Sequence, residues 1–298
     1  MSKLETVRLN VFQGMQNIPN FVADTKGFFS RQGICVETVF TKSSQEQRNA
    51  LRSGACDIVH SAVDNAFALA DESFPISIII GLDHGFNKIV TRAGLTSYED
   101  LRGKIFGVDA PDTAFALLGF DVLARHGLQK DRDYSVRVVG ATPFRLAALK
   151  SGEVDFALLN LPFNLLALDE GCHHLDDPAA VVGAYQATCG FASKKWVEAN
   201  RSLITLYCRA YVDGLRWARD PANRVELNRL ALDWFKLSPE MTQQCLDLVL
   251  DAKSGFALDA QISPAGFAQT LRLRDAFEGG GRTQAAQIDE SFYKAALV

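Results

Sequence analysis

An eight-residue pattern occurs twice in the chain. Ala50-Leu51-Arg52-Ser53-Gly54-Ala55-Cys56-Asp57 recurs as Ala148-Leu149-Lys150-Ser151-Gly152-Glu153-Val154-Asp155. In each copy a helix-like segment ends in Ser-Gly, and an Asp three residues later opens an apolar strand. Glycine commonly terminates helices because it adopts the left-handed conformation without strain. The repeat therefore predicts one α/β module used twice.

The segments around both copies alternate between short β-rich runs and helix-length amphipathic stretches, which is typical of parallel α/β units. A length of 298 residues also exceeds the usual range of a single core. We expect strands at 7–12, 35–40, 57–60, 76–82, 104–109, 135–140 and 188–193. We expect helices at 20–31, 44–52, 65–71, 111–126, 143–150, 201–219, 223–236, 239–251 and 264–277.

These elements predict an α/β protein with two Rossmann-like lobes. Lobe one comprises residues 1–86 and 188–298, and lobe two comprises 87–187. Two strands that cross between the lobes, near 82–90 and 183–190, would form a hinge. The helical C-terminal region is expected to pack on lobe one.

Composition excludes several classes of protein. Hydrophobic residues make up 48% and charged residues 22%, as in globular proteins. The net charge is −4 and the basic residues are scattered, so nucleic acid is not an expected partner. No apolar run approaches the roughly 18 residues of a membrane span, so we expect no membrane insertion.

The N-terminus and the cysteines give an expectation about location. Residues 1–6 show no signal-peptide pattern, which predicts a cytoplasmic protein, whereas removal of a leader would imply a periplasmic one. The six cysteines contain no CxxC pair or metal-ligand spacing, so we interpret them mostly as reduced core residues. No metal or cofactor is expected.

The sequence resembles the type II periplasmic substrate-binding proteins, in the branch that includes nitrate, sulfonate and taurine binders and the thiamine-pyrimidine-synthesis (NMT1/THI5-like) proteins. The resemblance covers nearly the whole chain. It rests on Lys-Gly-Phe-Phe at 26–29, Gly-Ile-Cys-Val-Glu at 33–37, Tyr-Glu-Asp-Leu-Arg-Gly-Lys-Ile-Phe-Gly-Val at 98–108, and both copies of the repeat. It implies closure of two lobes on a small-molecule ligand and, for an exported form, an ABC permease as partner.

In open α/β sheets, ligands bind outside the carboxyl ends of the strands. Residues that follow the expected strands are therefore the candidate ligand-binding set. From lobe one these are Gln13, Gly14, Ser43, Ser44, His60, Ser61, Asp64, Asn65, Asp83 and His84; from lobe two they are Asp112, Thr113, Thr142 and Asn160, with Pro162 beside it.

Four of these candidates begin expected helices, where the first amides and the positive dipole end favour an anion. They are Ser43, Ser44, Thr113 and Thr142. A carboxylate or sulfonate ligand fits this pattern, although such residues also serve as ordinary helix caps. Arg145 could reach the anion or lie on a solvated face.

Aromatic and histidine residues add further candidates. Phe12, Phe163 and Tyr185 could wall the cleft and stack on an aromatic ligand, or belong to the core. His173 and His174 are adjacent on an expected strand and should point to opposite faces, so they are not expected to share a metal.

Two functions stay open on these observations. The first is a solute-binding protein or cytoplasmic sensor that holds a small anionic organic molecule, and the second is an enzyme on the same fold. The resemblance includes a desulfinase with a catalytic cysteine and a pyrimidine synthase that consumes bound pyridoxal phosphate. Residues 13–20 lack the desulfinase cysteine, and only Cys189 stands where the synthase has a cysteine-rich stretch. An aromatic-acid decarboxylase or other lyase could use His60, Asp64 and His84.

Overall fold

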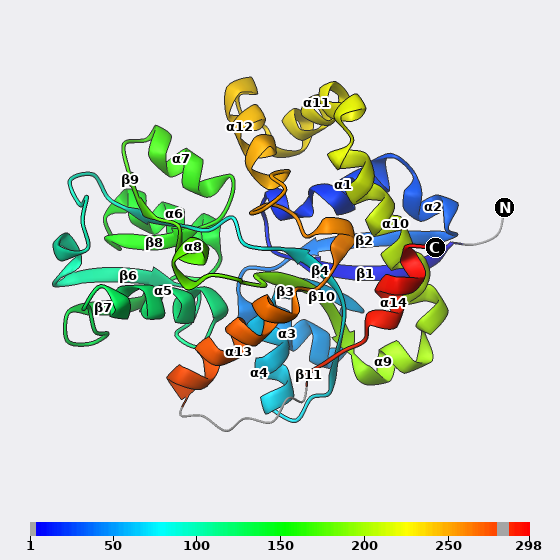
Figure 1. Cartoon of the computed structure of the whole chain (residues 1–298), viewed down its shortest axis with the longest axis horizontal. Helices are drawn as coiled ribbons and strands as arrows, with labels where there is room; N and C mark the ends of the chain where they lie inside the picture. Colours follow the sequence, from blue (N-terminus) through cyan, green and yellow to red (C-terminus); the bar gives the residue numbers. More distant parts are fainter. Residues whose placement is uncertain (1–3, 279–285) are drawn as a thin grey trace.

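The computed structural model describes residues 4–278 and 286–298, which form a mixed α/β fold with two sheets (Figure 1). The larger sheet has the strand order β11-β4-β10-β3-β1-β2 and the smaller sheet the order β7-β6-β8-β5-β9. The larger sheet comprises β1 (Glu5–Val11), β2 (Ile34–Phe40), β3 (Ile58–Ala62), β4 (Ile76–Asp83), β10 (Thr188–Ser193) and β11 (Ala286–Ile288). The smaller comprises β5 (Lys88–Thr91), β6 (Lys104–Val108), β7 (Tyr134–Val138), β8 (Phe156–Leu159) and β9 (His173–Asp176).

Helices cover both faces of each sheet, which explains why β3, β4 and β8 are buried along their whole length. In the first half of the chain these are α1 (Ile18–Thr25), α2 (Phe28–Arg31), α3 (Ser44–Ser53) and α4 (Val63–Asp71). The smaller sheet carries α5 (Ala114–Arg125), α6 (Thr142–Ser151), α7 (Phe163–Asp169) and α8 (Pro178–Val182). The predicted helix at 20–31 is two helices, because Gly27 adopts a left-handed conformation with φ 70° and interrupts it.

The repeated pattern forms equivalent joints in the two sheets. Gly54 and Gly152 both end a helix in the left-handed conformation, with φ 70° and 76°. The carboxylate of Asp57 accepts a hydrogen bond from the backbone N–H of Arg8 on β1, and that of Asp155 accepts one from Ile105 on β6, each at 2.8 Å. The repeat thus has a structural role in each sheet: its Asp forms a hydrogen bond between the strand that it precedes and the neighbouring parallel strand.

The C-terminal helices are α9 (Lys194–Ala199), α10 (Arg201–Arg219), α11 (Arg224–Phe235), α12 (Pro239–Val249), α13 (Pro264–Glu278) and α14 (Glu290–Ala296). Helix α10 packs against α1, α2 and α14 on the larger sheet, as expected for the tail. Helix α13 differs from that expectation, since it contacts α4 beside the larger sheet and α5 beside the smaller one (Figure 1). Its side chains reach both halves, so the helical tail is not confined to lobe one. No helix among the described residues is both long and apolar enough to cross a bilayer.

The chain passes between the two sheets at two neighbouring places. One is the turn between β4 and β5, and the other precedes β10. The backbone N–H of Ala187 donates to the carbonyl of Asp83 at 3.2 Å, and the Thr188 hydroxyl donates to the Asp83 carboxylate. The first passage, 84–87, connects β4 to β5, and the second, 183–187, connects α8 to β10, so neither is the continuous strand that the sequence suggested.

Candidate ligand-binding cavity

A small cavity lies where the carboxyl ends of the parallel strands in the two sheets face each other. Its volume of about 60 Å³ is room for several water molecules or part of a small ligand. Ten side chains singled out from the sequence line it. They are Phe12, Ser44, His60, Ser61, Asn65, Asp83, Thr113, Thr142, Arg145 and Asn160.

The remaining candidates do not line this cavity; some are held by other side chains, and the others line neighbouring hollows. Ser43 caps α3 by accepting from the Glu46 N–H at 3.1 Å, and Asp64 forms an ion pair with Arg274 of α13 at 3.0 Å. Asp112 pairs with Arg48 at 3.4 Å. Gln13, Gly14, Pro162 and Phe163 line a neighbouring crevice, whereas His84 and Tyr185 line a third hollow beside the passages between the sheets.

Several lining residues were not anticipated, notably Gln16, Asn87, Asp109, Phe115 and Thr188. Asp109 directly follows β6, so the strand-end rule could have found it. Thr188 escaped that rule because it begins an antiparallel strand, whose first residue lies at the same edge. Asn87 lies in a passage between the sheets, for which the sequence offers no comparable signal.

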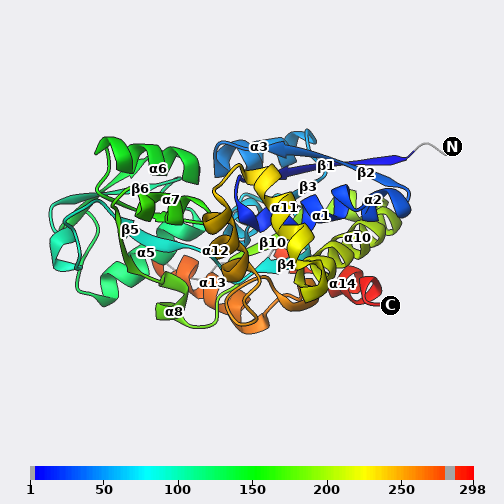
Figure 2. The same ribbon diagram turned by 90° about the horizontal axis from the view of Figure 1, so that it is seen from above.

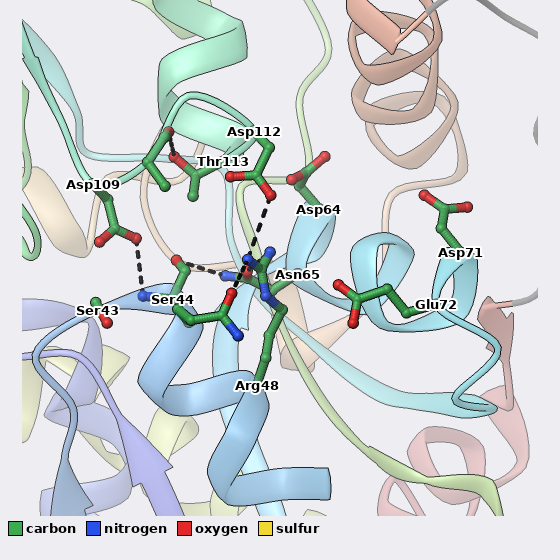
Figure 3. Close-up of polar contacts among 12 residues, drawn as sticks. Ser43, Ser44, Arg48, Asp64, Asn65, Asp71, Glu72, Asp109, Asp112 and Thr113 are labelled. Carbon is green, nitrogen blue, oxygen red and sulfur yellow. Dashed lines mark hydrogen bonds and ion pairs between the residues drawn. The ribbon is translucent and has the colours of Figure 1, made fainter. Parts of the chain in front are cut away.

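Direct polar contacts join the two halves next to the cavity (Figure 3). The backbone N–H of Ser44 at the start of α3 donates to Asp109 Oδ2 at 3.0 Å. Asn65 donates to the hydroxyls of Ser44 and Ser61 at 3.1 and 2.8 Å. The N-terminus of α3 is therefore already occupied by a carboxylate of this chain, and the serine and asparagine side chains are held in place.

Arg145 places a positive charge in the cavity wall. Its guanidinium donates to the carbonyls of Leu158 and Gly140 at 3.1 and 2.6 Å and to Thr142 Oγ1 at 2.8 Å. Burial lowers the pKa of Arg145 to about 10, and the nearby Asp109 opposes that change. The guanidinium therefore remains protonated at neutral pH, and two of its five N–H groups take no part in those three hydrogen bonds.

Burial keeps His60 neutral, because it lowers the pKa of the imidazole to about 3. The ring lies 2.8 Å from the hydroxyl of Tyr207 on α10. It also needs Gly190 as its neighbour on β10, since a Cβ there would lie 3.3 Å from the ring. His60 can thus offer a hydrogen bond to a ligand, but it contributes no positive charge.

Several acceptor oxygens in the wall have no donor among the described residues. Asp109 Oδ1, Asn87 Oδ1 and Asn160 Oδ1 are buried without a hydrogen-bond partner among the described residues. Asp83 is also buried, which raises its pKa to about 6, although bonds from Thr188 and the Gly85 N–H oppose the change. A buried acceptor without a partner costs about 1–3 kcal/mol, so a ligand that donates hydrogen bonds would be favoured here.

Comparisons with known proteins agree with this architecture. The family described as NMT1/THI5 like matches residues 15–223. A curated 4-amino-5-hydroxymethyl-2-methylpyrimidine phosphate synthase of Uromyces fabae is 25% identical over 258 residues, or 76% of this chain and 74% of the relative. A synthase of the same description from Saccharomyces cerevisiae is 27% identical over 123 residues, 40% of this chain and 35% of the relative.

Solved structures show the same fold at low sequence identity. A protein of Bordetella bronchiseptica RB50 matches with a TM-score of 0.84 at 21% identity, over 99% of this chain and 97% of that one. The periplasmic nitrate-binding protein of Synechocystis PCC 6803 matches with 0.82 at 15%, over 99% and 88%. The alkanesulfonate-binding protein of Xanthomonas axonopodis pv. citri bound to MOPS matches with 0.74 at 15%, over 93% and 92%.

Proposed function

The chain belongs to the NMT1/THI5-like family, and on that premise we propose that it binds a small organic molecule with an acidic group in the cavity between its two sheets and does not convert it. The fold is that of solute-binding proteins for nitrate and sulfonates, which supports ligand binding in general. The two halves would close on the ligand about the passages between the sheets, 84–87 and 183–187. An ABC permease would be a further partner of an exported form, and a cytoplasmic form would act as a sensor.

The observation that carries this proposal is the positive end of the cavity. Arg145 is buried there as a protonated guanidinium, and none of its hydrogen bonds among the described residues is to a carboxylate. The first amides of α5 at Ala114 and Phe115 line the same cavity, and they have no hydrogen-bond partner among the described residues. A carboxylate or sulfonate would satisfy both groups, because helix N-termini and guanidinium groups each favour anions.

The acceptor oxygens of the wall indicate a second chemical feature of the ligand. Asp109, Asn87 and Asn160 each present an unpartnered oxygen in the wall. A ligand with only an acidic group would leave these three oxygens without donors. We therefore propose that the ligand also carries N–H groups, as an amino acid or an amino-substituted aromatic acid does.

Matched compounds test both parts of the proposal. Benzoate with 4-aminobenzoate, and ethanesulfonate with 2-aminoethanesulfonate, differ by one amino group, and binding is measured by isothermal titration calorimetry. We expect binding that Arg145→Gln weakens by about 100-fold or more, since charged hydrogen bonds contribute about 1.5–3 kcal/mol each. Arg125→Gln, at an exposed ion pair on α5, is the matched control and should bind like the wild type. Absence of binding by every compound would contradict the proposal, and equal binding within each pair would remove the N–H requirement alone.

The curated relatives favour a second candidate, synthesis of a pyrimidine phosphate. The resemblance implies pyridoxal phosphate as the group that such synthases consume, and a lysine is the residue that forms a Schiff base with it. None of the described residues that line the cavity is a lysine or a cysteine. The cavity therefore does not fit a lysine-bound pyridoxal phosphate.

A lyase that uses His60, Asp64 and His84 has weaker support. His60 lines the cavity, Asp64 is engaged by Arg274, and His84 lies at a different hollow. The three side chains do not converge on one volume. Mass spectrometry of each compound before and after incubation with the protein tests turnover, and a product that depends on His60 would replace binding with catalysis as the function.

A further inference from the structure

A second hollow of about 600 Å³ lies near the cavity, and five of its lining residues are aromatic. Its lining residues come from α1, β2 and α11 beside the larger sheet and from α7 beside the smaller one. Figure 2 shows where these helices lie. We call it the aromatic crevice. Its aromatic residues are Phe21, Phe40, Phe163, Trp234 and Phe235.

The rings in the crevice are only partly covered by protein. Phe21 meets Trp234 edge-on, with ring centroids 5.5 Å apart, and tilts against Phe235 at 6.0 Å. Phe40 is 44% exposed. Partly exposed aromatic faces carry negative electrostatic potential, which attracts cations, and Trp is the strongest attractor.

Two polar groups of the crevice also carry negative charge or partial negative charge. Asp24 on α1 is the one charged side chain among the described lining residues, and its carboxylate has no ion pair or hydrogen bond within the described chain. Asn17 is 1% exposed, and its Oδ1 has no hydrogen-bond partner in the described part of the chain, while its Nδ2 donates to the Phe12 carbonyl at 2.8 Å. Aromatic faces, a carboxylate and an unpartnered amide oxygen all favour a positively charged occupant.

We propose that the aromatic crevice is a second binding site, specific for a small organic ammonium ion. The rings would surround the alkyl groups of the cation, and Asp24 would supply the counter-charge. Neutral apolar molecules would gain the ring contacts without the electrostatic attraction. This site is separate from the cavity and does not depend on the function proposed there.

The occupant would touch both halves of the molecule. Phe163 begins α7 beside the smaller sheet, while Trp234 lies on α11 beside the larger one. The N–H of Met15 donates to the Leu161 carbonyl at 3.0 Å, and the chain neighbours of these two residues line the crevice on one side, at Gly14 and Pro162, and the cavity on the other, at Gln16 and Asn160. An ammonium ion in the crevice would therefore stabilise the arrangement in which this contact is made.

Tryptophan fluorescence provides the test, because Trp234 lies in the crevice. Choline is titrated against 3,3-dimethyl-1-butanol, its neutral isostere. We expect a saturable change with choline and binding of the alcohol at least about tenfold weaker, the ratio that corresponds to a cation–π difference of about 1.4 kcal/mol. Trp234→Phe should abolish the optical change, and Asp24→Asn should weaken choline binding about threefold or more.

The control is Asp233→Asn, an exposed carboxylate adjacent to Trp234 that pairs with Lys236 and does not line the crevice. It should leave choline binding unchanged. Equal binding of choline and its isostere would overturn the proposal, as would the absence of a saturable change. An Asp24→Asn variant that binds choline like the wild type would also overturn it, and this exposed substitution carries little risk to folding.

Discussion

Imidazole Nε2 of His60 lies 2.8 Å from the hydroxyl of Tyr207, which joins the wall of the cavity to the core helix α10. Both side chains are buried, and His60 packs edge-on against Tyr211 one helical turn further along. The Tyr211 hydroxyl, in contrast, has no hydrogen-bond partner among the described residues. The two tyrosines thus differ in one bond while sharing the same helix and the same full burial.

The paired tyrosines give a matched test of that bond. Tyr207→Phe should lower the free energy of unfolding by about 1–3 kcal/mol, because it leaves a buried imidazole nitrogen without its partner. Tyr211→Phe should be neutral or slightly stabilising. Urea unfolding measures both, and equal losses in the two variants would show that the His60 contact contributes nothing.

Asp83 should make stability depend on pH. Burial raises its pKa to about 6 from the ordinary 3.8, so the folded protein binds the proton more tightly than the unfolded chain. The free energy of unfolding should therefore fall as pH rises from about 4 to about 6, by at most about 3 kcal/mol. Asp83→Asn should match the wild type near pH 4 and exceed it near pH 8.

Thr188→Val extends this test, since the Thr188 hydroxyl stabilises the charged carboxylate of Asp83. Loss of the hydroxyl should raise the pKa of Asp83 further, so the free energy of unfolding should continue to fall up to a higher pH than in the wild type. Urea unfolding between about pH 4 and pH 8 measures all three proteins. Parallel curves for the wild type and Asp83→Asn would exclude Asp83 as the source.

Replacing Gly14 by alanine should lower the free energy of unfolding more than replacing a glycine that has only a positive φ and no close neighbours. It has φ 147°, and a Cβ there would lie 2.8 Å from the Leu161 carbonyl and 2.9 Å from Asn160 Nδ2. Gly33 has φ 78° and nothing within 4 Å of its Cβ. Gly33→Ala should cost about 1–2 kcal/mol through backbone strain alone. Gly14→Ala should cost more and increase the radius of gyration in small-angle X-ray scattering; an unchanged radius would contradict this.

Arg274 on α13 should be important for stability. Its guanidinium contacts both oxygens of Asp64 and Oδ2 of Asp71, each at 3.0 Å, and it is 3% exposed. Arg274→Met should lower the free energy of unfolding by about 3–5 kcal/mol, because it removes the guanidinium that contacts the buried carboxylate of Asp64. Arg272→Met, at an exposed position on the same helix, should cost less than about 1 kcal/mol. Thermal or urea unfolding compares them, and similar losses would refute the assignment.

Local sequence patterns predicted most of the strands, namely β1, β2, β3, β4, β6, β7 and β10, whereas β11 was not predicted. The repeat is the clearest case, since Gly54 and Gly152 end their helices and Asp57 and Asp155 bond the neighbouring strands. These features depend on residues close in sequence or on a regular strand order. The same regularity brought most of the predicted strand-end residues to one cavity.

Contacts between segments far apart in the sequence could not be predicted from local sequence patterns. Asp64 follows β3 in the chain as a ligand-binding residue would, yet Arg274, far away in sequence, engages its carboxylate. His60 was expected to have a hydrogen-bonding role, but nothing in its local pattern indicates Tyr207. The aromatic crevice combines α1, β2, α7 and α11, and no local periodicity relates those four elements.

The two passages between the sheets have a mechanical consequence. Ala187 and Thr188 of one are hydrogen-bonded to Asp83 of the other, so the connections are fastened side by side. If the halves rotate, two connections held together in this way favour rotation about the line that runs through both of them. A distance between one probe on each half is then the measurement that would detect this rotation.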